Sequence, residues 1–420
     1  MIHATFRAGL VAAMLALLQS PHSLAQSNNQ SKDQGLLDLA TNEAPSVVVT
    51  LEKLVNIETG SSNAKGLDAM GQFLTGEFQK IGATVTRSKP TLPTSLGENF
   101  IAQWKGTGSG KVLMIAHMDT VYPEGTLAKA PFRVDGNRAF GPGIADDKGG
   151  IATILHAVKV LQARKFSQFD TLTVMINTDE ERGSFGSADL IRKLAGEHDL
   201  TLSFEPTVAL REMLTLGTAG VANIDVIVKG RAAHAGANPE QGVNALLEAA
   251  DFALRTSDLD DKAKDFRFNY TVGKAGTVTN VIPADATITA NVRFYDTALL
   301  ENALKTLREK AATPKFKDSV IEIKLSSTRP AFVADAKSKA LVDKALAVYK
   351  EIGHEMIVIP RVGGGTDAAF AAQSGKPVLE GLGLPGFGYH SDQAEYVNIE
   401  AIPRRLYLAV RMIEDGALGK

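Results

Sequence analysis

The segment Gly141-Pro142-Gly143-Ile144-Ala145-Asp146-Asp147-Lys148-Gly149-Gly150 places two adjacent carboxylates between a loop rich in glycine and proline and an apolar stretch. The apolar stretch, residues 151–161, has a spacing of 3.6 residues and predicts a helix. Adjacent carboxylates at such a junction repel each other, and a bound cation removes that repulsion. The segment therefore indicates a cation site in the loop that precedes this helix.

Acidic and imidazole side chains also follow the apolar strands predicted on either side of this segment. The residues that come directly after these strands are His117, Asp119, Glu180, Glu181 and Glu205. Because open α/β sheets form their sites at the carboxyl ends of strands, we expect these side chains to meet at one edge of a sheet. The pattern favours a hydrolase with two metal ions.

The candidate ligands divide into two sets that share one bridging carboxylate. We assign the first ion to His117, Asp146 and Glu205, and the second to Asp146, Glu181 and His390. Asp119 lies two residues from His117 on the same strand face and can orient an imidazole ring. Glu180 is then free to act as the general base on the metal-activated water. Histidine and carboxylate ligands favour two zinc ions, with cobalt or manganese as possible substitutes.

Each motif taken singly has a plainer interpretation. A histidine that ends a strand is usually a hydrogen-bonded structural residue, and Glu180-Glu181 alone is typical of a solvated turn. Asp146-Asp147 alone is compatible with a cap on the following helix. The metal interpretation rests on the occurrence of all three motifs at successive strand ends.

The order of predicted elements indicates a mixed α/β fold with an inserted domain. Helices and strands alternate up to about Gly217, which predicts a largely parallel sheet covered by helices. The order then becomes β-α-β-β-α-β, the split βαβ (ferredoxin-like) arrangement, before the first rhythm resumes. We predict a discontinuous catalytic domain at residues 31–218 and 332–420, and an inserted domain at residues 219–331.

Composition excludes several classes of protein. The chain has 420 residues, of which 44% are hydrophobic and 22% charged, as in an ordinary globular protein. The formal net charge of -2 argues against a nucleic-acid binder, which would carry a basic surface. There is no cysteine, so thiolate ligands and cysteine nucleophiles are excluded.

The first residues have the layout of a secretory signal peptide. One positive charge precedes the apolar residues 8–18, and the small residues Ser23 and Ala25 precede Gln26. We predict that residues 1–25 are removed and that the mature protein is exported to the periplasm or secreted, without a membrane anchor. An uncleaved anchor is the alternative, although the apolar segment is short for a bilayer. Residues 27–35 are polar and are expected to be disordered.

Long motifs of this chain resemble the co-catalytic zinc family of aminoacylases and carboxypeptidases, and in particular its bacterial glutamate carboxypeptidases. That family includes acetylornithine deacetylase and succinyl-diaminopimelate desuccinylase. The resemblance covers nearly the whole mature chain and is carried by residues 117–121, 141–150, 177–181, 203–207, 363–367 and 384–392. It implies the same ligands and the same general base as the residues themselves indicate, with a cis bond between Asp146 and Asp147.

The resemblance also implies roles that the residues alone would not have given. The inserted domain corresponds to a lid that carries the homodimer contact, and His234 to a residue that reaches across the dimer to the tetrahedral oxyanion. Without the resemblance, His234 is a surface histidine at a strand end. The residues that correspond to the substrate-carboxylate site are Arg329, Arg293 and Asn280. For either arginine, a surface salt bridge is the plainer alternative.

The function implied is hydrolysis of the amide that joins an acyl group to a C-terminal glutamate, with folates and their analogues as substrates. One departure bears on this specificity, because Met213 stands where the resemblance implies a lysine near the glutamate pocket. Two alternatives remain open. One is an aminoacylase or dipeptidase of the same family, and the other is a non-catalytic zinc-binding protein, against which the free base Glu180 argues.

Overall fold

The computed structural model describes residues 32–419, so the predicted signal peptide at residues 1–25 lies outside the described residues. Among the helices of residues 32–419, none is both long and apolar enough to cross a bilayer. Contacts group the chain from Asp33 onward into one unit. The predicted domain boundaries therefore stay a prediction, although the six-stranded and the four-stranded sheet have separate cores.

The central sheet has six strands in the order β1-β2-β6-β3-β7-β19. Their bounds are β1 Thr84–Ser88, β2 Asn99–Lys105, β6 Thr171–Asn177, β3 Lys111–His117, β7 Leu200–Ser203 and β19 Val378–Glu380. The strands from β6 to β19 pair in parallel, whereas β1 and β2 add an antiparallel edge. The predicted mixed, largely parallel sheet is confirmed.

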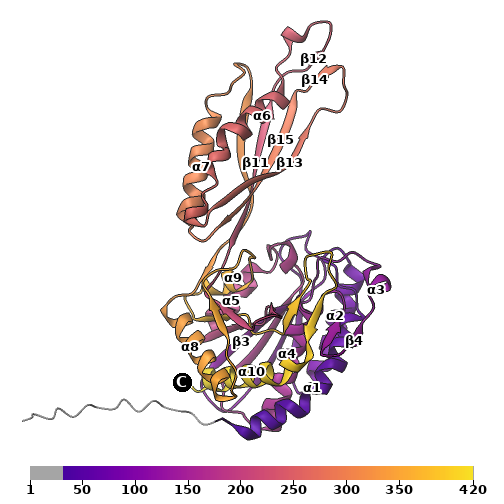
Figure 1. The fold of residues 1–420 in the computed structure, drawn as a ribbon, viewed down its shortest axis with the longest axis vertical. Helices are drawn as coiled ribbons and strands as arrows, with labels where there is room; N and C mark the ends of the chain where they lie inside the picture. Colours follow the sequence, from indigo (N-terminus) through magenta and orange to yellow (C-terminus); the bar gives the residue numbers. More distant parts are fainter. Residues whose placement is uncertain (1–31, 420) are drawn as a thin grey trace, which may run out of the picture. The chain divides into compact units, whose positions relative to one another are not determined.

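Helices cover both faces of this sheet, because alternate residues of its strands enter different cores. In β3, Val112, Met114 and Ala116 join the larger core, and Leu113 and Ile115 join a smaller one on the opposite face. The helices of the larger core are α1 Gln34–Val55, α2 Ala64–Lys80, α4 Lys148–Ala163, α8 Ala336–Glu351 and α10 Ile402–Ala417. The smaller core contains α5 Ala188–Glu197 and α9 Ala368–Ala372. Figure 1 shows these helices around β3.

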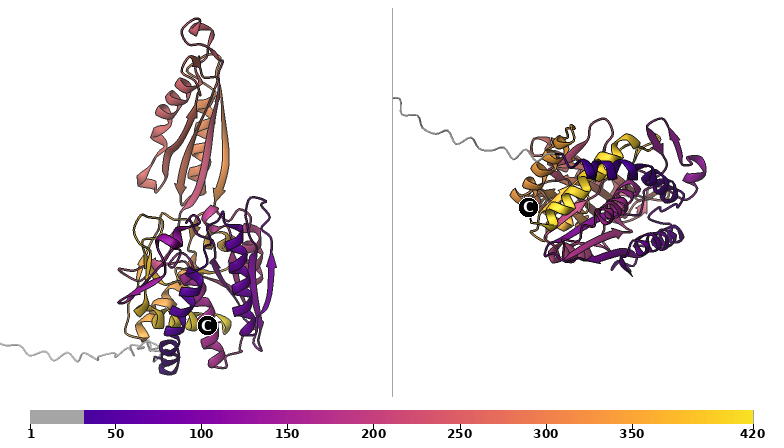
Figure 2. Two further views of the ribbon diagram at one scale, coloured as in Figure 1. Left: turned by 90° about the vertical axis from the view of Figure 1, so that its right-hand side faces the viewer. Right: turned by 90° about the horizontal axis from the view of Figure 1, so that it is seen from below.

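A second sheet lies between the two halves of the first in sequence. Its four strands pair antiparallel in the order β13-β15-β11-β16, with bounds β13 Arg267–Ala275, β15 Asp285–Phe294, β11 Gly220–Lys229 and β16 Val320–Arg329. Helices α6 Ala245–Thr256 and α7 Thr297–Ala311 pack on one face and close a separate core (Figure 2). The predicted order β-α-β-β-α-β is what the structure contains.

Short strands lie in the loops around the sheet edge, and of these the sequence predicted only a strand at residues 356–359, which corresponds to β18. A five-stranded sheet consists of β4 Arg133–Asp135, β5 Arg138–Phe140, β21 Tyr396–Asn398, β20 Pro385–Phe387 and β8 Thr207–Val208. Three strand pairs complete the described elements: β9 Met213–Thr215 with β18 Ile357–Ile359, β10 Gly217–Thr218 with β17 Phe332–Val333, and β12 Ala233–His234 with β14 Val281–Ile282. The short helix α3 spans Thr126–Lys129. Strands of two or three residues are too short to show an alternating pattern.

The first helix begins inside the segment, residues 27–35, that was expected to be disordered. Helix α1 starts at Gln34, where the side chain of Asp33 accepts a hydrogen bond from the backbone N–H of Leu36 at 2.9 Å. The expectation of disorder is therefore wrong for the end of residues 27–35. Pro45 lies inside the helix, and the buried residues Leu36 and Ala40 extend its apolar stripe toward the N-terminus.

Candidate metal centre

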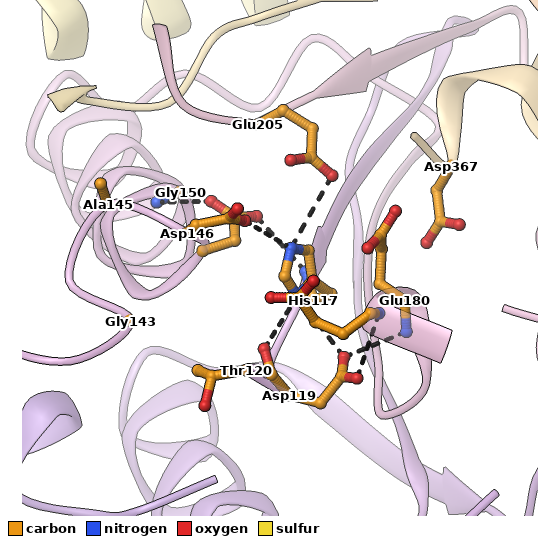
Figure 3. Close-up of polar contacts among 12 residues, drawn as sticks. His117, Asp119, Thr120, Gly143, Ala145, Asp146, Gly150, Glu180, Glu205 and Asp367 are labelled. Atoms are coloured by element: carbon orange, nitrogen blue, oxygen red, sulfur yellow. Dashed lines mark hydrogen bonds and ion pairs between the residues drawn. The ribbon is translucent and has the colours of Figure 1, made fainter. Parts of the chain in front are cut away.

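The predicted ligands meet at the carboxyl edge of the central sheet. His117 ends β3, Glu181 lies in the 3₁₀ turn that follows β6, and Glu205 follows β7. Asp146 lies in the loop before α4, and His390 comes from the loop between β20 and β21. Parallel neighbouring strands bring these loops to one edge, as Figure 3 shows around His117.

The side chains form two sets around Asp146. In the first set, Nε2 of His117 lies 3.0 Å from Oδ1 of Asp146 and 3.8 Å from Oε1 of Glu205. In the second set, Nε2 of His390 lies 3.2 Å from Oδ2 of Asp146 and 3.1 Å from Oε2 of Glu181. The ligand atoms of each set all lie within 4.8 Å of one another. Each oxygen of Asp146 thus faces a different histidine, which is the arrangement that a bridging carboxylate needs.

Hydrogen bonds fix the orientation of the His117 ring. Its Nδ1 lies 3.0 Å from the backbone oxygen of Asp119, to which the Nδ1–H donates, and this bond directs Nε2 at Oδ1 of Asp146. The carboxylate of Asp119 lies farther from the ring, with Oδ1 at 3.4 Å from Nδ1. It accepts instead from the backbone N–H groups of Glu180 at 3.0 Å and Glu181 at 3.2 Å. Asp119 therefore holds the turn that carries the proposed base and a ligand.

Burial and mutual charge shift the pKa values of the cluster. Burial raises the pKa of Glu205 well above its usual range and that of Glu181 to about 7. Hydrogen bonds to Asp146 and Glu181 raise the pKa of His390 to about 10. Burial opposes the charge on His117, but hydrogen bonds to Asp119 and Asp146 outweigh burial and raise its pKa. The cluster thus offers three carboxylates and two imidazoles at a largely buried edge of the sheet. These are the ligands that a pair of divalent cations requires.

The next residue, Asp147, caps helix α4 and is linked to Asp146 by a cis peptide bond, as the resemblance implied. Its Oδ1 accepts from the backbone N–H of Gly150 at 3.1 Å, and its Oδ2 accepts from the N–H of His117 at 3.3 Å. The helix cap and the bridging ligand are thus neighbouring residues. The alternative interpretation of this acidic pair, a cap on the following helix, is correct for Asp147. Asp146 alone reaches the ligand cluster.

Arg329 lies against the proposed base. It is 4% exposed, and its Nη1 forms an ion pair with the carboxylate of Glu180. Its Nη2 donates to the backbone oxygen of Glu180 at 2.6 Å and to Oγ of Ser184 at 3.2 Å, and Nη1 donates to the oxygen of Gly365 at 2.6 Å. The alternative of a surface salt bridge is wrong for Arg329, because the whole guanidinium is buried.

The other predicted substrate residues lie on the second sheet or beside it. Arg293, on β15, is half-buried and donates from Nη1 to the backbone oxygen of Gly363 at 3.4 Å. His234 and Asn280 are exposed and lie together near β12 and β14, where the N–H of Ala235 donates to the backbone oxygen of Asn280 at 2.9 Å. That bond extends the pairing of the two short strands.

The side chain of His234 is bonded only within its own loop among the described residues. Its Nδ1 accepts from the backbone N–H groups of Gly236 and Ala237 at 3.1 and 3.0 Å. A nitrogen that accepts hydrogen bonds carries no proton itself. The proton of the neutral ring therefore belongs to Nε2.

A cavity of about 240 Å³ opens beside the ligand cluster. Its lining includes the ligand carboxylates and His390, together with the apolar residues Val208, Met213, Ile359 and Val362. No lysine or arginine lines it within the described part of the chain. The cavity is large enough for one amino-acid side chain, and its described lining offers no lysine or arginine to an acidic one.

The sequence did not single out two buried residues that support the site. Lys148 is 1% exposed, and its Nζ donates to the backbone oxygens of Ile57 at 3.0 Å and Pro142 at 3.1 Å. Glu395 is 5% exposed and accepts hydrogen bonds from the loop that carries Asp146. Glu395 lies five positions after His390, but an acid in a loop gives no sign in the sequence that it will be buried.

Comparisons with known proteins identify the family of this chain. Residues 113–415 match the model of peptidase family M20/M25/M40. The chain is 53% identical over 408 residues to Carboxypeptidase G2 of Pseudomonas sp. (strain RS-16), covering 97% of this chain and 98% of that protein. It is 31% identical over 353 residues to succinyl-diaminopimelate desuccinylase of Granulibacter bethesdensis, covering 77% of this chain and 87% of that one.

Solved structures show the same fold at low sequence identity. A tripeptidase from Staphylococcus aureus matches with a TM-score of 0.74 and 20% identity, covering 89% of this chain and 99% of that one. A metallo-carboxypeptidase from Sulfolobus solfataricus matches with a TM-score of 0.71 and 15% identity, covering 89% and 99% of the two chains. The predicted resemblance is confirmed, and the chain belongs to peptidase family M20/M25/M40.

Proposed function

We propose that this protein is a two-zinc glutamate carboxypeptidase that hydrolyses the amide between an acyl group and a C-terminal glutamate, with folates and their analogues as substrates. Membership of the peptidase family and 53% identity to Carboxypeptidase G2 make the chain a metallocarboxypeptidase. The observation that carries the two-metal assignment is the position of Asp146, whose two oxygens face different histidines at 3.0 and 3.2 Å. Zinc is the preferred metal because the donors are imidazole and carboxylate.

When bound, two divalent ions lower the pKa of a shared water and polarise the substrate carbonyl. The protein supplies the proton transfer, for which Glu180 is placed next to the ligand Glu181 on a turn held by Asp119. Glu180 accepts the proton of the attacking water and delivers it to the nitrogen of the leaving amino acid. Glu180 is 7% exposed, so few water molecules compete for that proton.

The decisive experiment replaces Glu180 by glutamine in the zinc-loaded protein. Glutamine keeps the size of the side chain but accepts no proton, so hydrolysis of an acyl-glutamate should fall by about 100- to 10,000-fold. Zinc content, measured by atomic absorption after dialysis, should stay at the wild-type value. Glu197→Gln, on the exposed end of α5, is the matched control and should change neither quantity.

Two other outcomes would change the assignment. A Glu180→Gln protein with wild-type activity would remove Glu180 from the mechanism. Wild-type protein that binds zinc but cleaves no N-acyl amino acid would instead support the non-catalytic zinc-binding alternative.

An aminoacylase or dipeptidase with another side-chain preference is the second candidate. It is favoured by the cavity beside the ligands, where the described lining lacks a lysine or arginine and presents Met213. The test compares folate, acyl-glutamate, acyl-glutamine and acyl-alanine at equal concentration. A higher kcat/KM for the glutamate substrates supports the first candidate, and equal values for glutamate and alanine end the glutamate claim.

We also propose that the protein is a homodimer joined through residues 219–331, which act as a lid, and that His234 completes the partner's site. His234 is exposed, and the bonds to its Nδ1 leave Nε2–H free to donate to an oxyanion. Mixing inactive His234→Ala with inactive Glu180→Gln tests this, because a mixed dimer has one complete site. Re-equilibrated mixtures should recover about a quarter of wild-type activity, and no recovery would mean that His234 acts within its own chain or not at all.

Export to the periplasm or the medium is proposed from residues 1–25 alone, which have a signal-peptide layout. N-terminal sequencing of the mature protein from cell fractions tests it. A mature terminus at Gln26 in the exported fraction supports the proposal, and full-length protein confined to the cytoplasm contradicts it.

A further inference from the structure

We propose that Glu395 is a positioning residue that holds the bridging ligand Asp146 in place and couples the two metal-binding sets. The inference rests on the proposed two-metal function of the site. Glu395 has no contact with a substrate or an ion in this assignment. It acts on the backbone of the loop that carries Asp146.

The carboxylate of Glu395 binds three backbone N–H groups of that loop. Oε2 accepts from Gly143 at 2.7 Å, and Oε1 accepts from Ala145 at 2.7 Å and from Asp146 itself at 3.1 Å. The backbone oxygen of Glu395 accepts a fourth bond, from the N–H of Gly141 at 3.1 Å. Because hydrogen bonds to an ionised acceptor are stronger than neutral ones, these contacts fix the loop that leads into the bridging residue.

The loop conformation creates the need for this acceptor. Gly143 has a φ of +72°, and a Cβ at this position would lie 2.5 Å from Cγ2 of Thr120. The turn directs N–H groups inward, away from any strand or helix partner, where each needs an acceptor. The two carboxylate oxygens of Glu395 accept from three of these N–H groups. A single side chain therefore fixes the position of the backbone at Asp146.

The position of Glu395 in the chain links the two metal-binding sets. Residues 390–395 carry His390, a ligand of the second set, at one end and Glu395 at the other. Through Glu395 this segment is bonded to the residues around Asp146, which belongs to both sets. A shift of Glu395 therefore moves the bridging carboxylate relative to His390.

A buried acid can also do no more than stabilise a loop, and the chain contains such a case. Glu248, on α6 in the second sheet's core, is 0% exposed and accepts from the N–H groups of Lys315 at 3.0 Å and Phe316 at 2.7 Å. It also accepts from Oγ of Ser319 at 2.8 Å. Like Glu395, Glu248 is buried and accepts hydrogen bonds from backbone N–H groups of a loop, but that loop carries no metal ligand.

The experiment therefore compares Glu395→Gln with Glu248→Gln in the full-length protein. A glutamine amide at position 395 would place its NH₂ against at least one backbone N–H, so the loop loses a bond and shifts. Zinc affinity is measured by competition with a chromogenic chelator, and unfolding by urea in metal-free buffer. We expect about 10- to 100-fold weaker zinc binding for Glu395→Gln, as for other groups that orient ligands, together with a fall in kcat larger than any rise in KM.

Glu248→Gln should lose stability while its zinc affinity stays within about twofold of wild type. A changed visible absorption spectrum of the cobalt-loaded Glu395→Gln protein, absent in Glu248→Gln, would further support a displaced ligand. Wild-type zinc affinity and wild-type kcat in Glu395→Gln would overturn the proposal. Zinc affinity and the cobalt spectrum need no substrate, so failure of the proposed hydrolysis is distinguishable from failure of this inference.

A measurement on the wild-type protein tests the proposal even if Glu395→Gln does not fold. Amide hydrogen exchange of Gly143, Ala145 and Asp146 is followed in the metal-free and the zinc-loaded states. Protection of all three amides in both states supports a carboxylate that positions the loop before metal binds. Fast exchange in the metal-free state would contradict it.

Discussion

Arg329 contacts Glu180 twice, through an ion pair with its carboxylate and through a bond of 2.6 Å from Nη2 to its backbone oxygen. Arg329 ends β16 of the second sheet, whereas Glu180 follows β6 of the first. The proposed base is thus held by a residue from the other sheet, and the proposed substrate-carboxylate residue is already bonded within the protein.

A double-mutant cycle should show strong coupling between these residues. Breaking a buried ion pair on one side costs about 3 to 5 kcal/mol, because the remaining charge is left without a partner. Arg329→Gln should therefore lower the free energy of unfolding of the metal-free protein by about that amount. The double variant Glu180→Gln, Arg329→Gln should be more stable than Arg329→Gln alone. Urea unfolding measures all four proteins, and additive effects would show that the two residues do not interact.

The bridging role of Asp146 predicts different zinc contents for two isosteric variants. Asp146→Asn removes charge from both sets, so this variant should retain fewer than about one zinc per chain after dialysis. Glu205→Gln alters only the first set and should retain about one. Glu197→Gln, exposed on α5, again serves as the control. Equal zinc contents for the two ligand variants would show that Asp146 is not shared.

Replacing Met213 by lysine should increase the preference of the enzyme for glutamate substrates. Met213→Lys places an ammonium in a cavity whose lining has no lysine or arginine within the described residues. A hydrogen-bonded ion pair with the substrate side chain should raise the ratio of kcat/KM for acyl-glutamate over acyl-alanine by about 10- to 100-fold. Met213→Leu is the neutral control and should leave the ratio unchanged. An unchanged ratio in Met213→Lys would mean that the glutamate side chain binds elsewhere.

The buried His156 should make the folded protein less stable in mild acid, independently of the metal centre. The side chain is fully buried in α4, with Nε2 at 2.8 Å from Oγ1 of Thr50 and Nδ1 at 2.6 Å from Oε1 of Glu43. Burial lowers its pKa to about 4, despite the opposing bond to Glu43. The unfolded chain therefore takes up this proton near pH 6.5, before the folded protein does.

The stability contributed by neutral His156 is fully present above about pH 6.5 and is lost as the pH falls toward about 4. The loss should reach about 3 kcal/mol near pH 4. His156→Gln should lack this part of the pH dependence, as measured by urea unfolding of metal-free protein at several pH values. Parallel curves for wild type and His156→Gln would contradict the assignment.

The placement of three ligands could be predicted because each of them follows an apolar strand. His117, Glu181 and Glu205 come at the ends of apolar strands, and parallel strands place their carboxyl ends at one edge. The start of helix α1 was harder to predict from the sequence. Pro45 obscured the pattern, and the cap at Asp33 lies in a polar stretch that carries no periodic signal.

Sequence by itself determined the order of the longer elements, the two main groups into which they fall and the residues offered to a pair of ions, because strand periodicity and strand-end chemistry are local properties. Tertiary structure decided the contacts between distant segments: Arg329 on Glu180, and Glu395 under the loop of Asp146. Neither contact has a signature in the sequence. An acid or an arginine is buried only if segments distant in the sequence pack against it. That packing exists only in the folded chain.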